Sequence, residues 1–404
     1  MEKKSNKNLE IYNKGSKYLM ATYSRLPVVF VRAKMQYLWD ANGERYLDFI
    51  AGYGCLNVGH SNNFVLKRLK QQIDKIIQSS NIYYNEPQVE LAKKLCQITD
   101  FGNKVFFANS GTESVEGAIK LARMYSLEKY HAEKRFEIIS FYKSFHGRTL
   151  GALAATAQPE KQKIFKPLLE GFKYAKLNDF DSVKEKINDN TCAVIIEPVQ
   201  GEGGVNVTDQ KFMVWLREIC DKNNILLIMD EIQTGFGRTG NMFAYQNFGI
   251  YPDIMVVAKS LGGGMPIGAI ISKEEVASVF GPGSHGSTFG GNAASCVAGC
   301  AVVDYMIEND LCKRAKVLGE YFINKLKKLA GKYSIIKEVR GMGLMIGMEF
   351  KKPVADDLVK KAIKDHIVLN KVSTYTLRFL PPLIITKRDM NILIKWLNKN
   401  IKDL

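Results

Sequence analysis

Two apolar segments of the chain end in residues whose chemistry is complementary. Residues 225–229 are apolar and lead to Asp230, and residues 254–258 are apolar and lead to Lys259. Such short runs predict buried strands of a parallel sheet, in which ligands bind at the carboxyl ends of the strands. An amine can condense with an aldehyde, and a carboxylate can keep a pyridine nitrogen protonated so that the ring accepts electrons. The pair therefore suits the cofactor pyridoxal 5'-phosphate (PLP).

Taken singly, each of these residues has an ordinary structural explanation. An Asp at the end of a strand often caps a turn, and a Lys is usually solvated. Here both are followed by glycine-rich turns, at residues 235–240 and 262–264, where the backbone can approach a ligand closely. The combination favours a cofactor site over two unrelated polar residues.

A third feature could bind the phosphate of such a cofactor. Residues 104–108 predict a strand, residues 109–113 (NSGTE) a small polar turn, and residues 114–129 a helix. Free backbone N–H groups and the positive end of the helix dipole would then face an anion. Ser110 and Glu113 also match a capping box, and both interpretations can hold at once. The turn lacks the Gly-Lys-Ser/Thr of a nucleotide P-loop.

Another predicted strand, at residues 136–141, precedes two residues that could contact a planar cofactor and its substrate. Phe145 could stack on a ring, and Arg148 could hold a carboxylate by a two-pronged hydrogen bond. Taken alone, a core phenylalanine and a surface arginine are the simpler interpretation. The spacing by itself does not decide between them.

The composition predicts a globular protein with room for a large domain and a smaller one. The chain has 404 residues, of which 46% are hydrophobic and 24% charged. No apolar run is long enough to span a bilayer, and the N-terminal segment has no signal-peptide core. Seven cysteines without a Cys-x-x-Cys pair fit a reducing compartment and argue against disulfides or a metal site. We expect a cytoplasmic protein without metal or membrane contact.

The net charge of +16 is the one unusual bulk property. It could indicate a nucleic-acid partner or the steering of anionic substrates. The lysines, however, are spread along the whole chain, without an aromatic-basic platform or a recognition helix. We therefore favour a solvated, lysine-rich surface, and a basic nucleic-acid-binding protein stays a remote alternative.

Several elements outside this region can also be predicted. Residues 1–16 are polar and expected to be loosely held, whereas apolar residues recur at helical spacing from residue 63 to 79. A long helix at residues 293–308 is expected to bridge to the second domain. No internal repeat or flexible linker is evident, so the two domains should pack tightly.

Seven motifs in one order and spacing resemble a known family. They are NSGTE at 109–113, FHGRT at 145–149, IIEPVQGEGG at 195–204, MDEIQTGFGRTG at 229–240, AKSLGGGMPIGA at 258–269, HGSTFGGN at 285–292 and LRFLPPLIIT at 377–386. From about residue 20 to 395 the chain resembles the class III, fold type I PLP-dependent aminotransferases, most closely the acetylornithine aminotransferases.

The resemblance implies a fold and a division into domains. The expected fold is α/β, with a large domain built on a mostly parallel seven-stranded sheet flanked by helices and a smaller α+β domain made from both termini. Residues 1–50 and 306–404 would form the small domain, and residues 51–305 the large PLP-binding domain.

The resemblance also implies roles for residues around the cofactor. Lys259 would bind the aldehyde and then move the proton between substrate and cofactor, while Asp230 would hold the pyridine nitrogen. Contacts to the ring hydroxyl, the phosphate and the ring face are implied for Gln233, for Gly111 with Thr112, and for Phe145. Thr288 would reach the cofactor phosphate of the neighbouring subunit, so we expect a homodimer with active sites at the interface.

Four residues are implied to bind the substrate. Arg148 would clamp the α-carboxylate of the amino donor, with Ser287 nearby. Glu202 would mask Arg378 while a terminal-amine substrate is bound, and would free it for glutamate or 2-oxoglutarate. Such a pair avoids an unpaired charge in a partly desolvated pocket. Glu202 follows a predicted buried strand that ends at a second acid, Glu197.

The reaction implied is transfer of the δ-amino group of N2-acetylornithine to 2-oxoglutarate, giving N-acetylglutamate 5-semialdehyde and glutamate for arginine biosynthesis. Ornithine, succinylornithine, N-succinyl-diaminopimelate and 4-aminobutyrate are alternative donors, and an aminomutase or a racemase is an alternative on the same fold. The chain has Cys55-Leu56 where family members often have Val-Asn, in a loop expected near the substrate tail. His146 favours the acetylornithine type over the ornithine type, which more often has Trp there.

Overall fold

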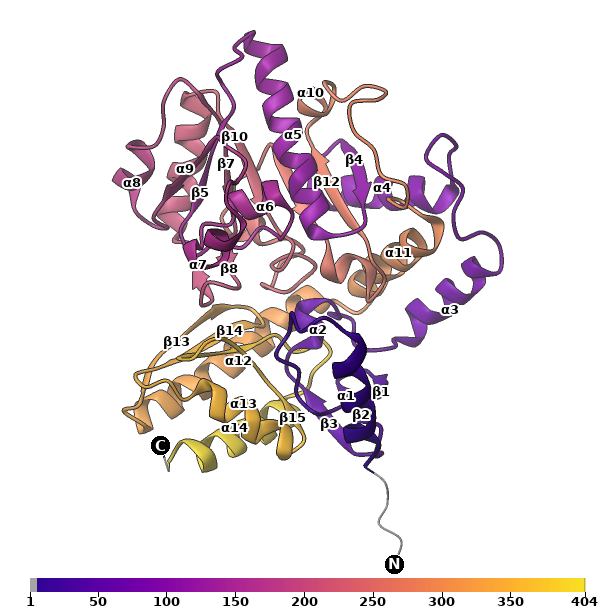
Figure 1. The fold of residues 1–404 in the computed structure, drawn as a ribbon, viewed down its shortest axis with the longest axis vertical. Coiled ribbons are helices and arrows are strands. Elements are labelled where there is room, and N and C mark those ends of the chain that lie inside the picture. The colour runs from indigo at the N-terminus through magenta and orange to yellow at the C-terminus, as the bar shows by residue number, and fades with distance from the viewer. Residues whose placement is uncertain (1–5, 403) are drawn as a thin grey trace, which may run out of the picture.

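A seven-stranded sheet is the central element of the fold (Figure 1). The computed structural model describes residues 6–402 and 404. In order across the sheet, the strands are β4 (Lys104–Ala108), β12 (Gly268–Ser272), β11 (Ile254–Val257), β10 (Leu226–Asp230), β7 (Thr191–Ile196), β5 (Glu137–Phe141) and β6 (Phe172–Ala175). Strand β12 runs antiparallel to both of its neighbours, and the other neighbouring pairs are parallel. This confirms the mostly parallel sheet that was expected.

Helices cover both faces of this sheet because its strands are apolar on both sides. In β10, Leu227 and Met229 belong to one buried cluster, whereas Leu226 and Ile228 belong to another. Side chains alternate between the faces of a strand, so a continuous apolar run needs a helical layer on each side. The first cluster includes residues of α4 (Glu86–Thr99), α9 (Gln210–Lys222) and α11 (Ala293–Glu308), and the second includes residues of α5 (Gly111–Tyr130) and α6 (Leu150–Ala155).

The two ends of the chain come together below the large sheet in Figure 1. One four-stranded sheet joins β1 (Phe30–Lys34), β2 (Tyr37–Asp40) and β3 (Arg45–Asp48) to β15 (Ile367–Val368). Another consists of β13 (Ile336–Met342), β14 (Met345–Phe350), β17 (Thr376–Phe379) and β16 (Asn370–Ser373). Because Ile367 pairs with Leu47, segments from both termini share one sheet, as expected for the smaller domain. The boundaries at residues 50/51 and 305/306 stay a prediction.

Three helices pack with these two sheets: α12 (Leu311–Lys332), α13 (Ala355–Lys364) and α14 (Lys387–Ile401). Their inward faces are apolar and buried, as Phe322 of α12 and Leu393 of α14 illustrate. The other elements are α1 (Lys7–Tyr18), α2 (Ala51–Gly54), α3 (Asn63–Ile73), α7 (Pro159–Gln162), η1 (Lys163–Phe165), α8 (Phe180–Lys184), β8 (Val199–Gln200), β9 (Asn206–Val207), η2 (Ala244–Asn247), η3 (Lys259–Gly262) and α10 (Glu274–Ala277).

The N-terminal segment is better ordered than its polar composition predicts. Helix α1 begins after Asn6, whose side chain accepts a hydrogen bond from the Leu9 N–H. The buried side chain of Asn8 donates to Asp40 (2.7 Å) and accepts from the Val29 N–H (3.0 Å). The expectation of a loosely held segment is therefore wrong for residues 6–16, because polar contacts attach it to β2. Residues 1–5 of that prediction lie outside the described residues.

The helix expected at residues 63–79 is also shorter than its apolar pattern suggests. Helix α3 ends at Ile73, and the Gln72 side chain then donates to the carbonyl of Ile76. The side chains of Ile76 and Ile77 are exposed rather than buried. The apolar spacing at Ile76 and Ile77 therefore does not mark the buried face of a helix.

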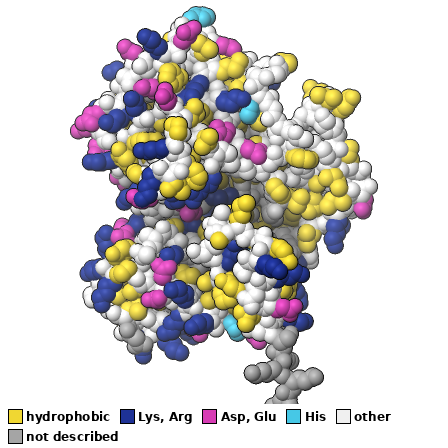
Figure 2. Space-filling view, viewed as in Figure 1, with side chains coloured by type: hydrophobic (Ala, Val, Ile, Leu, Met, Phe, Trp, Pro, Cys, Tyr) yellow, Lys and Arg dark blue, Asp and Glu magenta, His cyan; other side chains and the backbone are white. Residues whose placement is uncertain are grey.

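Basic and acidic side chains are interspersed on the surface. Figure 2 shows Lys and Arg scattered over both halves of the molecule on the face in view, with Asp and Glu between them. This distribution fits the solvated, lysine-rich surface predicted from the sequence. Among the residues that the structure describes, no helix has both the length and the apolarity of a membrane span.

Candidate active site

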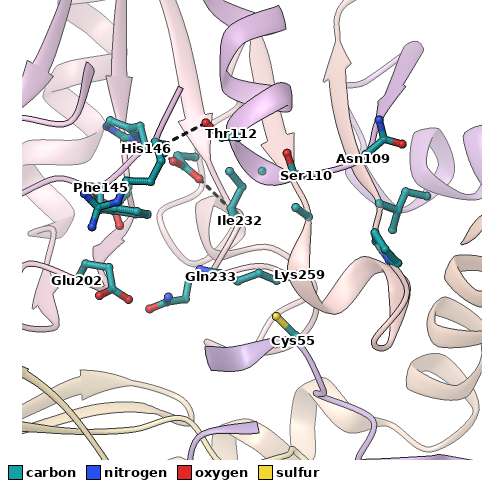
Figure 3. A pocket seen from close by; sticks show the side chains of 18 of the residues that line it. Cys55, Asn109, Ser110, Thr112, Phe145, His146, Glu202, Ile232, Gln233 and Lys259 are labelled. Atoms are coloured by element: carbon teal, nitrogen blue, oxygen red, sulfur yellow. Dashed lines mark hydrogen bonds and ion pairs between the residues drawn. The ribbon is translucent and has the colours of Figure 1, made fainter. Parts of the chain in front are cut away.

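A cavity of about 430 Å³ lies at the edge where the parallel strands end. Its lining residues follow five strands of the large sheet: Asn109 to Thr112 after β4, Phe145 to Arg148 after β5, Glu197 after β7, Asp230 at the end of β10 and Lys259 after β11. The structure thus brings Asp230 and Lys259 to one cavity, at the sheet edge where the sequence predicts them. Figure 3 shows how the labelled side chains surround it.

Asp230 is held rigidly at the end of β10. Its side chain is 3% exposed, and one carboxylate oxygen accepts from the Ile232 N–H at 3.0 Å. The other lies 2.7 Å from Nδ1 of His146, which is also buried. These contacts orient a buried carboxylate toward the cavity, where it can bind a protonated ring nitrogen.

Lys259 lies in a strained backbone position beside the cavity. Its φ angle is +45°, and the next residue anchors the turn because the Ser260 hydroxyl donates to the carbonyl of Gly54 at 2.6 Å. Burial lowers the pKa of the Lys259 amine, and the negative charge of Glu202 partly opposes this shift. The amine therefore loses its proton more readily than an exposed lysine.

The N-terminus of α5 faces the cavity through Ser110, Gly111 and Thr112. The Ser110 hydroxyl accepts from the Glu113 N–H (3.3 Å), whereas the Glu113 carboxylate accepts from the N–H of Asn109 (2.7 Å). The predicted capping box is therefore only half formed, because the Glu113 carboxylate binds the N–H of Asn109 and not the N–H of Ser110. Within the described chain, the N–H groups of Gly111 and Thr112 have no protein acceptor, so they can bind an anion.

Gly111 also has a steric reason to be glycine. A Cβ atom at this position would lie 2.8 Å from Cδ1 of Ile232, a residue that also lines the cavity. The absence of a side chain at Gly111 therefore lets Ile232 pack directly against the start of α5. The next residue, Thr112, connects α5 to the segment after β5, because its hydroxyl accepts from the N–H groups of Arg148 and Thr149, both at 3.2 Å.

Phe145 and Arg148 form another part of the cavity wall. The Arg148 guanidinium lies 5.6 Å from the centre of the Phe145 ring, and the Lys161 ammonium lies 5.7 Å from it. Arg148 is exposed, so its charge is available to a ligand. Two cations beside one aromatic ring favour the binding of an anionic molecule there.

Arg378 and Glu202 form an ion pair of 2.6 Å next to the cavity. Arg378 lies in β17 and is fully buried, whereas Glu202 lies in the turn between β8 and β9 and lines the cavity. The Arg378 guanidinium also donates to the carbonyl of Gly201 (2.9 Å), to Oε1 of Gln233 (3.1 Å) and to Oδ1 of Asn370 (2.8 Å). Four acceptors thus hold the arginine in place, and only one of them is charged.

The electrostatics of Glu202 depend on this arginine. Burial acts to raise the pKa of the Glu202 carboxyl, but Arg378 outweighs burial and holds the pKa below its usual value. Glu202 therefore stays ionised at neutral pH and covers Arg378 from the cavity side. A competing carboxylate that displaced Glu202 would meet a preformed guanidinium.

Three residues expected near the substrate or cofactor are not among the residues that line this cavity: Arg378, Ser287 and Thr288. Arg378 lies next to the cavity and pairs with Glu202, which lines it. The Ser287 hydroxyl accepts from the side-chain amide of Asn109 (3.0 Å), so it contacts the wall from behind. Thr288 accepts through its backbone carbonyl from the Gln78 side chain. Their roles stay predictions. Cys55 does line the cavity, and burial raises the pKa of its thiol.

Two buried residues of the site were not assigned a role from the sequence. His146 contacts Asp230, and Glu197 accepts from the N–H groups of Phe145 (2.8 Å) and Gly201 (3.1 Å). In the sequence, both residues follow apolar runs that predict strands, as Lys259 does. The order of these strands in the sheet then shows that they belong to the site. Because β5, β7 and β10 are neighbours, residues that follow β5 and β7 must lie beside the end of β10.

Comparison with known proteins places the chain in a family. The family described as aminotransferase class-III matches residues 18–401. The chain belongs to the class-III aminotransferases. The curated acetylornithine aminotransferase of Aquifex aeolicus is 50% identical to this class-III aminotransferase over 93% of this chain and 97% of the relative. The enzyme of the same name from Methanocaldococcus jannaschii is 49% identical over 95% of this chain and 96% of its own.

A solved structure confirms the fold of this class-III aminotransferase. The ornithine aminotransferase of Toxoplasma gondii superimposes with a TM-score of 0.94 at 31% identity and covers 98% of this chain and 94% of its own. That enzyme holds PLP at partial occupancy in its active site. The large sheet, the flanking helices and the smaller sheets described above are therefore the architecture of the family.

Proposed function

We propose that this class-III aminotransferase is PLP-dependent and moves the δ-amino group of N2-acetylornithine to 2-oxoglutarate, forming N-acetylglutamate 5-semialdehyde and glutamate. The observation that carries the reaction class is the meeting of Lys259 and Asp230 in one cavity beside the N-terminus of a 20-residue helix. The similarity to curated acetylornithine aminotransferases, at 49–50% identity over nearly the whole chain, supports the choice of donor.

The donor and acceptor groups of the cavity fit PLP. The free N–H groups of Gly111 and Thr112 suit the phosphate, Asp230 suits the pyridine nitrogen, and Phe145 suits the ring face. When bound, PLP supplies an electron-accepting ring that stabilises negative charge on the reacting carbon of the substrate.

Lys259 and Asp230 then have separate tasks. Nζ of Lys259 would hold the aldehyde of bound PLP and would then take and return the proton at the substrate carbon, which its lowered pKa favours. Asp230, oriented by His146, would keep the ring nitrogen of bound PLP protonated. Gln233 would contact the ring hydroxyl of bound PLP, and its side-chain oxygen also accepts from Arg378, so it would connect the cofactor to the Arg378–Glu202 pair.

The Arg378–Glu202 pair, termed the gate below, selects between the two substrates. With Glu202 in place, the gate is neutral and accepts the uncharged chain of an acylated donor. Glutamate and 2-oxoglutarate carry a second carboxylate, which replaces Glu202 on Arg378. Arg148 holds the carboxylate that the acylated donor, glutamate and 2-oxoglutarate have in common. Ser287 supports the cavity through its contact with Asn109.

The biological setting follows from this reaction. We propose arginine biosynthesis in the cytoplasm by a homodimer whose active sites lie at the subunit interface. Thr288, which lies outside the cavity of its own chain, would complete the phosphate site of the neighbouring subunit. Light scattering of the holoenzyme should then give twice the mass of the 45.5 kDa chain.

A donor panel tests the substrate. Purified holoenzyme is assayed at fixed 2-oxoglutarate with N2-acetylornithine, ornithine, succinylornithine, N-succinyl-diaminopimelate and 4-aminobutyrate, and kcat/KM is compared. We expect N2-acetylornithine to rank first, and a last place would refute the assignment. Turnover without any 2-oxo acid would instead indicate an aminomutase or a racemase.

Ornithine is the second candidate donor. It is favoured by the structural similarity to the Toxoplasma gondii ornithine aminotransferase. The lower identity to that enzyme, 31% against 49–50% for the acetylornithine enzymes, makes it the weaker candidate. The same panel distinguishes the two donors.

A further inference from the structure

Glu197 is a buried acid to which the proposed reaction assigns no role. It directly follows β7, which pairs in parallel with β10 and places Ile196 opposite Met229. The next residues along these strands, Glu197 and Asp230, are therefore neighbours at the sheet edge. Glu197 is 7% exposed and lines the cavity. The chain thus places a second carboxylate beside the one assigned to the cofactor.

The two oxygens of Glu197 bind two different segments of the wall. One accepts from the N–H of Phe145 at 2.8 Å, and the other accepts from the N–H of Gly201 at 3.1 Å. The carbonyl of Gly201 in turn accepts from Arg378 at 2.9 Å. A continuous path of hydrogen bonds therefore connects the aromatic wall to the gate. In Figure 3, Phe145 and Glu202 lie on the same side of the pocket.

A charged side chain at this position is costly. Burial raises the pKa of the Glu197 carboxyl to about 7; His146 opposes this rise, and the charge of Asp230 adds to it. Lys161 is a further charged group whose pKa responds to Glu197. A glutamine would avoid the buried charge but has a single acceptor oxygen, whereas a carboxylate presents two. The two-segment contact explains why the acid is suited to this position.

We infer that Glu197 is a positioning residue that holds Phe145 and the Gly201–Glu202 turn at a fixed separation. The cofactor beside Phe145 and the gate at Glu202 then keep the spacing that one bound substrate needs to contact both. The inference rests on the proposed function. A purely structural acid would stabilise the fold without changing the balance between the two substrates.

The chain offers a matched control for the substitution Glu197→Gln. Glu231 is 1% exposed, directly follows Asp230 and has a pKa raised by burial to about 7. Like Glu197, it accepts from a backbone N–H, that of Tyr245 at 2.8 Å. It also accepts from the Thr234 hydroxyl at 2.5 Å. Glu231 does not line the cavity. Glu231→Gln therefore also replaces a buried acid by an amide, but it leaves the contacts of Glu197 with Phe145 and Gly201 intact.

Three measurements test the inference on the full-length protein. Fluorescence titration should give a Kd for PLP about 10-fold weaker in Glu197→Gln and unchanged within about 2-fold in Glu231→Gln, as expected for loss of one hydrogen bond to a charged group. The KM for 2-oxoglutarate should rise about 10-fold in Glu197→Gln, with a smaller change for the acylated donor. In the wild type this KM should increase as the pH falls through about 7, because protonation removes the negative charge of Glu197 and weakens its two accepted hydrogen bonds. Glu197→Gln should lack this dependence.

Equal effects of the two substitutions on PLP affinity and on the KM ratio would overturn the inference, as would an unchanged pH profile in Glu197→Gln. The PLP titration needs no turnover, so it tests Glu197 even if no donor of the panel is accepted and the proposed substrate fails. A wild-type protein that binds no PLP would refute both proposals.

Discussion

The sheet edge lines the cavity directly, whereas the gate meets the cavity through Glu202, and the two are built in different ways. At the sheet edge, Asp230 and Lys259 come from the neighbouring strands β10 and β11 of the central sheet. At the gate, Glu202 and Arg378 are separated by 176 residues and lie in a turn and in one of the smaller sheets. The edge depends on one rigid sheet, whereas the gate depends on how two parts of the fold pack together.

This difference indicates which steps each part serves. Both half-reactions need the cofactor and a proton carrier, so damage to the sheet edge should affect donor and acceptor equally. Only a substrate with a second carboxylate needs the arginine, so damage to the gate should affect one half-reaction. The following substitutions test this division.

Lys259→Ala should have the largest effect. Removal of the amine should lower kcat/KM by about 10⁴-fold or more in both half-reactions, because binding of the aldehyde and proton transfer are lost together. Single-turnover absorbance changes, with donor alone and then with 2-oxoglutarate alone, measure the two halves separately. Lys273→Ala is the control, since Lys273 pairs with Asp253 outside the cavity. A loss confined to one half-reaction would break the comparison.

Asp230→Ala should have the next largest effect, again in both halves. Without the carboxylate the ring nitrogen loses its proton, and turnover should fall about 10³-fold while Lys259 still binds the aldehyde. Absorption spectra of the variant with PLP, together with the same single-turnover assay, test both parts. Normal rates with a normal spectrum would contradict the role of Asp230.

Arg378→Ala should separate the half-reactions. The kcat/KM for 2-oxoglutarate should fall about 100-fold, as expected for loss of charge-assisted hydrogen bonds, whereas the value for the acylated donor should change little. Arg238→Ala is a matched control because Arg238 is equally buried but donates only to neutral acceptors: the carbonyls of Leu344 and Pro381 and the side chain of Asn57.

Arg238→Ala should lower the free energy of unfolding by about 3 kcal/mol, because these acceptors are left buried without a donor. The substitution should leave the ratio of the two half-reactions intact. Urea unfolding and the single-turnover assay measure the two properties. A change in that ratio as large as in Arg378→Ala would show that any buried arginine of this region affects specificity.

Glu202→Gln should have a smaller effect of the opposite kind. An amide cannot neutralise Arg378, so the acylated donor should meet an uncovered charge and its kcat/KM should fall about 10-fold. Reaction with glutamate should be retained or improve, since its carboxylate has less competition for Arg378. Steady-state kinetics with both donors test this, and equal losses for both would contradict the gate.

The pH dependence of stability gives the subtlest test. Burial raises the pKa of Glu231 at the edge to about 7, so its contribution to stability is present below the unfolded value near 4.5 and is lost as the pH rises through about 7. At the gate, Arg378 holds the pKa of Glu202 low despite its burial, so that contribution is present above about 4.5 and is lost as the pH falls through the lowered pKa. In urea unfolding from about pH 2.5 to 8, Glu231→Gln should reduce the decline of the unfolding free energy toward neutral pH, and Glu202→Gln should reduce its decline below about pH 4.5. Identical profiles for the two variants would contradict the opposite shifts.

The central sheet was predictable because its signals are local. Apolar runs such as residues 226–229 and 254–257 predict buried strands, and the polar residue after each run predicts the functional edge. Predictions at the periphery were weaker. Helix α1 depends on the contact between Asn8 and Asp40, which no local pattern of residues 1–16 reveals.

The sequence by itself determined which chemical groups stand at the ends of which strands, since side-chain type and strand period are properties of neighbouring residues. Only the tertiary structure decided that Glu202 covers Arg378 and that Glu197 binds Phe145 and Gly201 together. Those contacts join segments that are far apart in the chain, and their geometry depends on the packing of whole layers.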